Sequence, residues 1–100
     1  MTNDIDQIAT ELAAKDFNLE LVPSAEAREV LADRIAFLLE NNPILLKSIF
    51  YRIDLNESLL GMALVSMEGR ALHLELADQV LERMRKKAEW RLKTSQRNLD

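Results

Sequence analysis

The spacing of apolar residues along the chain predicts a series of amphipathic helices. Over residues 24–40 and 67–96, apolar side chains recur every three or four positions, which is the period of one helical face. Ile5, Ile8 and Leu12 form a similar stripe near the N-terminus. Between 43 and 52 apolar residues cover most of the helical circumference, so we expect this helix to be central and heavily buried.

The predicted helices are bounded by recognisable start and stop signals. Pro43 suits the first position of a helix, where no backbone donor is needed, and Glu57 would complete a capping box that opens a helix to about residue 65. Weak helix formers at 66–69 predict a break, because an unbroken helix from 56 to 97 would span about 60 Å. Residues that commonly cap helices stand at the expected starts, namely Asn3, Ser24, Asn42 and Asp54.

Together these elements predict an all-α fold in a single domain covering residues 1–100. The expected architecture is a compact bundle of four or five helices, with a long C-terminal helix that projects beyond it. Only two Gly and two Pro interrupt the chain, and aromatic residues make up 5% of it, which favours helices over strands. Residues 17–21 alternate apolar and polar positions as a strand does. Because no other segment offers a partner strand, we expect an extended connector held against the core.

Composition also narrows the cellular setting. The chain has no Cys, which excludes disulfides and thiolate metal sites and permits a reducing compartment. Its longest apolar run, residues 59–65, is far shorter than the roughly 20 residues needed to cross a bilayer. The N-terminus is acidic where a signal peptide would be basic. We therefore expect a cytoplasmic protein without a membrane partner.

Side chains suited to catalysis are sparse. His73 is the only imidazole, and none of the residues three or four positions away can bind a metal: Gly69, Arg70, Leu76 and Ala77. Glu75, Asp78 and Glu82 share one helical side, but such rows more often pair with Lys or Arg one turn away. Neither Gly belongs to a phosphate-binding loop. The sequence predicts no catalytic residue, no cofactor and no metal site, so we expect a protein that is not an enzyme.

The predicted C-terminal helix carries a seam of apolar residues that is longer than a small bundle needs. We expect part of this seam to be buried in a homodimer or against a partner protein. This predicts a non-enzymatic interaction or adaptor module that associates with itself. The residues of the seam step by three and four along the helix: Leu74, Ala77, Leu81, Met84 and Ala88.

The same helix supports an alternative prediction, a nucleic-acid-binding accessory protein. Seven Lys or Arg lie between 83 and 97 against one acid, Glu89, in a chain whose formal net charge is -4. That acidic balance and the dipole preference for cations at a helix C-terminus count against it. A helix-turn-helix reader is excluded, because residues 56–65 contain no Lys or Arg. The candidate nucleic-acid contacts are Arg83, Lys86, Lys87, Trp90, Arg91, Lys93 and Arg97.

A third, weaker candidate is the predicted turn that contains Tyr51, Arg52 and Asp54, where a small ligand could bind. The surrounding segment resembles a group of small uncharacterised bacterial all-helical proteins over about a fifth of the chain. This resemblance implies a compact helical fold in a bacterial cytoplasm and assigns no activity. The matching residues are Asn42, Pro43, Leu45, Leu46, Tyr51, Arg52, Ile53 and Asp54.

Overall fold

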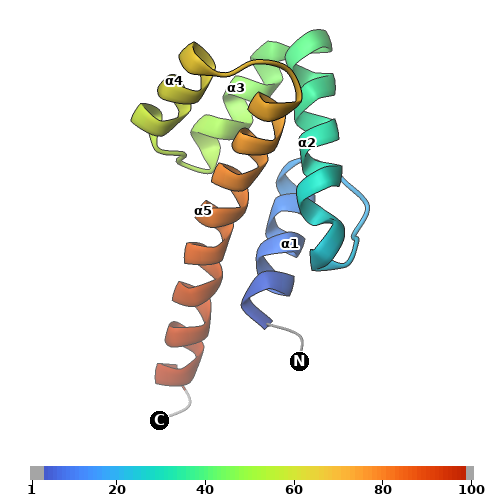
Figure 1. Ribbon diagram of the computed structural model, residues 1–100. Helices are drawn as coiled ribbons and strands as arrows, with labels where there is room; N and C mark the ends of the chain where they lie inside the picture. The colour runs from blue at the N-terminus through green and yellow to red at the C-terminus, as the bar shows by residue number, and fades with distance from the viewer. Residues whose placement is uncertain (1–3, 99–100) are drawn as a thin grey trace.

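The computed structural model describes residues 4–98, and it confirms an all-α bundle with a long C-terminal helix (Figure 1). No strand occurs within the described range, and no helix there is long and apolar enough to cross a membrane. The five helices are α1 (Asp4–Asp16), α2 (Ser24–Asn41), α3 (Pro43–Arg52), α4 (Glu57–Ser66) and α5 (Gly69–Asn98).

The central element is α5, against which α1, α2 and α4 pack. At 1.5 Å per residue its 30 residues span about 45 Å, close to the 47 Å length of the whole molecule. Leu76, Val80 and Met84 of α5 are completely buried. The core around them is built mainly from α1, α2 and α5.

The prediction that the helix at 43–52 is central was wrong. Leu46, Ile49 and Phe50 of α3 are buried, but Ile44 is 82% exposed and Tyr51 is 84% exposed. In Figure 1, α3 lies behind the first half of α5, between α2 and α4, and these neighbours leave the part of its circumference that carries Ile44 and Tyr51 uncovered. Its apolar residues extend all the way round, and half of them face solvent.

Local signals fixed two of the helix boundaries. Asn42 caps α3, because its side-chain oxygen accepts a 3.2 Å hydrogen bond from the backbone N–H of Leu45, with Pro43 in the first helical position. The predicted break between the last two helices is also confirmed. Residues 67 and 68 are not helical, and Gly69 has a φ of 60°, in the left-handed region that glycine tolerates best.

Two predicted caps were wrong, and a third lies outside the described residues. Ser24 is already the first residue of α2, whose cap position is taken by Pro23 without a side-chain hydrogen bond. Asn56 rather than Asp54 caps α4, since its side-chain oxygen accepts a 3.1 Å hydrogen bond from the N–H of Leu59. Asp54 instead adopts a φ of 61° in the turn before the helix. The predicted cap Asn3 is not described.

The segment between α1 and α2 forms the predicted connector. It contains no strand, and Phe17 at its start is buried against the ring of Phe50 in an edge-to-face contact with centroids 6.4 Å apart. Leu19 is partly buried against the core, whereas Leu21 is exposed. The connector is therefore held to the bundle mainly by its first half.

Arginine–carboxylate pairs join the outer helices to α5. Arg28 of α2 forms a bidentate pair with Asp78, at 2.8 and 3.0 Å, and this hydrogen bonding raises the pKa of the Arg28 guanidinium. Arg70 bonds Glu29 and Asp33 on α2, and these hydrogen bonds raise its pKa in the same way. The three carboxylates are about half-exposed or more, so these ion pairs orient α2 against α5 more than they stabilise the fold.

Candidate protein-interaction surface

The predicted apolar seam of the C-terminal helix lies inside the chain's own core. Ala77, Met84 and Ala88 are completely buried, and Leu74 and Leu81 are partly buried and pack against the core cluster. Packing of α1 and α2 on this side of α5 accounts for the burial. A second copy could reach the seam only if these helices moved away, so any interface of the folded chain must use another surface.

One basic residue of the predicted nucleic-acid site, Arg83, is engaged within the chain. Arg83 is turned toward the end of α3, where its Nε donates a 3.0 Å hydrogen bond to the carbonyl of Ile53 and its Nη2 lies 3.6 Å from the Asp54 carboxylate. Trp90 is 65% exposed. The side chain of Arg97 lies outside the described residues. Four further cations form no ion pair with any described carboxylate: Lys86, Lys87, Arg91 and Lys93.

The three side chains of the Tyr51–Asp54 turn do not converge on a ligand site. Arg52 reaches back to the end of α1, with its Nε 3.8 Å from the Asp16 carboxylate and its Nη2 3.4 Å from the Asp16 carbonyl. Asp54 faces Arg83, and Tyr51 is almost fully exposed. Two of the three therefore tie helices together, while Tyr51 belongs to the surface described next.

An apolar groove lies between α3 and α4. It encloses about 580 Å³, and its lining is mostly carbon. Leu46, Phe50 and Leu55 are the buried apolar residues that line it. Charged residues occur on both of its sides, Lys47 on α3 and Glu57 on α4. A concave apolar surface with a few charges is the usual form of a site that accepts an apolar side chain or a helix.

The outer side of α4 is apolar as well. Residues 58–67 contain no charged side chain, yet only Ala63 of this helix is fully buried. Met62 is 66% exposed and Val65 is 90% exposed. Helices that are apolar all round are normally buried on all sides, so α4 presents the surface of a helix that lacks a neighbour.

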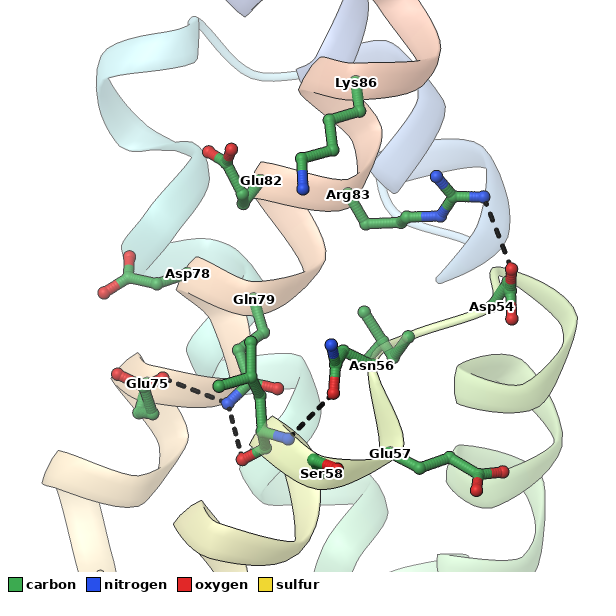
Figure 2. A pocket seen from close by; sticks show the side chains of 12 residues that line it. Asp54, Asn56, Glu57, Ser58, Glu75, Asp78, Gln79, Glu82, Arg83 and Lys86 are labelled. Carbon is green, nitrogen blue, oxygen red and sulfur yellow. Dashed lines mark hydrogen bonds and ion pairs between the residues drawn. The ribbon is translucent and has the colours of Figure 1, made fainter.

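On its other side, α4 forms a polar pocket with α5, shown in Figure 2. The pocket encloses about 750 Å³ and opens between the start of α4 and the first half of α5. Gln79 spans it by donating to the Leu59 carbonyl at 3.1 Å and to the Glu75 carboxylate at 3.0 Å. Two cations, Arg83 and Lys86, line the pocket with five acids: Asp54, Glu57, Glu75, Asp78 and Glu82. We call it the acidic pocket.

Two of the five acids that line the acidic pocket pair with arginines. Asp78 is engaged by Arg28, and Asp54 by Arg83. Over the described part of the chain no group of three or more His, Asp or Glu side chains comes close enough to hold a metal ion. His73, half-buried on α5, stands apart from the residues that line the pocket.

Sequence reasoning missed the exposure of α4. The signal was present, because residues 58–67 form a ten-residue stretch without charge, and an amphipathic surface helix would carry charge on its outer side. The burial of this helix was not predicted, since a single sequence does not show how many neighbours an apolar helix has. No protein-family model, curated protein or solved structure matches this chain, so the resemblance of residues 42–54 to small bacterial helical proteins stays a prediction.

Proposed function

We propose that this protein is a non-enzymatic interaction module that associates with itself through the surface around α4. The observation that carries the proposal is the exposure of Met62 and Val65 on a helix without charged side chains between residues 58 and 67. Exposed apolar patches of this kind mark interaction sites on monomeric proteins. The surface differs from the α5 seam that the sequence indicated, but the proposed class of function is the same.

Two further features support an interaction role over catalysis. The groove beside α4 is lined mostly by carbon atoms and has one cation, Lys47 on α3, and two acids, Asp54 in the turn and Glu57 on α4. Such a site positions an apolar partner but offers no nucleophile paired with a base. A cytoplasmic location and a bacterial source stay predictions that accompany this proposal.

The proposal is tested by measuring mass in solution over a range of protein concentrations. Light scattering of the intact chain should show the mass rising from 11.5 kDa toward twice that value as concentration increases. The double substitution Met62→Glu and Val65→Glu places two charges on the outer side of α4 and should hold the chain at the monomer mass. Leu21→Glu, at another exposed apolar residue, is the matched control and should still associate. A wild-type chain that stays monomeric throughout would overturn the proposal.

The second candidate is nucleic-acid binding by the end of α5. It is favoured by one observation, the exposure of Trp90 among cations that have no described acidic partner. Base stacking on an aromatic ring next to cations is a common way to bind single strands. Binding to a mixed pool of RNA and DNA that weakens steeply with salt would support it, because phosphate contacts release counterions.

A further inference from the structure

One face of α5 is divided by charge. At 100° per residue, Glu75, Glu82, Lys86 and Lys93 fall within an arc of about 40°. The two acids belong to the first half of the helix and line the acidic pocket. The two lysines belong to the second half, although Lys86 still lines the pocket at its edge. A second α5 running in the opposite direction would set the acidic half of each helix beside the basic half of the other. Such complementarity steers association and fixes register.

The other helices also cover the two halves of α5 unequally. In Figure 1, α4 stands beside the first half of α5, whereas the second half runs past α3 and α4 and has only α1 next to it. The ion pair of Arg85 with Asp6, at 2.9 Å, joins α1 to that second half. In an antiparallel pair, the α3–α4 layer of each copy would lie beside the second half of the other copy's α5, which that copy's own α3 and α4 do not cover.

Trp90 supplies an apolar anchor on the uncovered half. Trp90 lies seven residues after Arg83, so both side chains project from nearly the same side of α5. Arg83 reaches Asp54 at the end of α3, so this side of α5 faces the end of α3. Trp90 therefore projects from the same side of α5 as the α3–α4 layer, which lies nearer the start of that helix. Leu59 of α4 is half-exposed and lines the acidic pocket, where it offers an apolar contact. Tryptophan is enriched among the residues that dominate binding energy.

From these three features we infer that the partner is a second copy of this chain, packed antiparallel about a twofold axis. The free end of α5 from each copy lies against the acidic pocket of the other, with Trp90 next to Leu59. This inference rests on the proposed function. Leu59 connects the acidic pocket to the outer side of α4, since it lies one helical turn before Met62. A twofold interface uses the same two surfaces twice, and one chain supplies both an acidic pocket and a basic helix end.

A charge-swap experiment tests the inference. One variant carries Lys86→Glu and Lys93→Glu, at the two lysines of the charged face, which makes the helix end acidic. The other carries Glu57→Lys and Glu82→Lys, which makes the pocket basic. All four residues are exposed, so both variants should fold, and circular dichroism checks their helix content. In a mixed pair, the acidic end of one variant meets the basic pocket of the other, while the second half of the interface keeps its natural charges.

We expect each variant alone to dimerise at least about tenfold more weakly than the wild type, and the equimolar mixture to recover dimers. Dimerisation of either variant alone as tight as that of the wild type, or a mixture that dimerises no better than the variants alone, would overturn this arrangement while leaving self-association through α4 intact. A wild-type chain that is monomeric at all concentrations would overturn the proposed function as well. Loss of nucleic-acid binding in the first variant, without any dimer in the wild type, would assign the basic end to nucleic acid instead.

Discussion

Arg83 of α5 donates a 3.0 Å hydrogen bond from its Nε to the carbonyl oxygen of Ile53, thirty residues earlier in the chain. This contact fixes the end of α3 to the middle of the long helix, at a carbonyl that the end of the helix leaves without an intrahelical partner. It also turns the guanidinium toward Asp54 and away from any nucleic acid. A basic residue of the C-terminal helix thus has a structural role.

Replacement of Arg83 by Met should lower the free energy of unfolding by about 1 kcal/mol, because a hydrogen bond to a partly buried carbonyl is lost while the apolar stem remains. Urea denaturation followed by circular dichroism measures the change. Lys86→Met is the matched control, since Lys86 is exposed and has no described ion-pair partner, and it should be near neutral. Equal effects of the two substitutions would contradict the structural role of Arg83.

Met84→Ala should lower the free energy of unfolding by about 2–4 kcal/mol, because Met84 is completely buried and its truncation leaves a cavity. The loss should be the same at every protein concentration, since the side chain packs within one chain. An interface residue would behave differently, so a destabilisation that disappears on dilution would place Met84 between two copies. Chemical denaturation at two protein concentrations separates these outcomes.

The two glycines should respond to alanine in opposite directions. Gly69→Ala should destabilise the chain by about 1 kcal/mol, because its φ of 60° is unfavourable for a residue with a Cβ. Gly61 lies inside α4 with nothing within 4 Å of an added Cβ, so Gly61→Ala should stabilise by about 0.5–1 kcal/mol. Thermal unfolding of the two variants compares them directly. A stabilising Gly69→Ala would show that the break between α4 and α5 has another conformation.

Asn56→Ala should cost about 1 kcal/mol, because it removes the side-chain oxygen that accepts from the N–H of Leu59. Asn56→Asp keeps an acceptor at the same position and should retain most of the stability. Equilibrium denaturation of both variants tests the assignment of the cap. If Asn56→Ala is silent, the start of α4 is fixed by something other than this residue.

The start of α4 shows why one of two similar cap signals was misread. At the start of α3, Asn42 stands directly before Pro43 and is the one suitable cap, so local chemistry alone fixes where this helix begins. Before α4 both Asp54 and Asn56 can cap a helix, so the outcome depends on their neighbours. Ile53 and Leu55 are both buried, and the left-handed turn at Asp54 brings both into the core. The helix can begin only after that turn, which is a tertiary constraint.

The candidate site was less accessible from sequence than the fold. Periodicity correctly gave an apolar side to α5 but could not say whether α1 and α2 or a second copy would cover it. The reverse error occurred at α3, where a helix that is apolar on most of its circumference was expected to be heavily buried, yet Ile44 and Tyr51 are exposed. In both cases the pattern shows that a surface avoids water, whereas the number of neighbouring helices depends on how the whole chain packs.

The packing of α1 on α5 has a consequence for synthesis of the chain. The buried side chains of α1, including Ala9 and Ala13, belong to the same core as those of α5, which is synthesised about fifty residues later. At about 5–20 residues per second, several seconds separate the synthesis of the two helices. During that interval α1 lacks its principal neighbour, so the bundle can close only once α5 has left the ribosome.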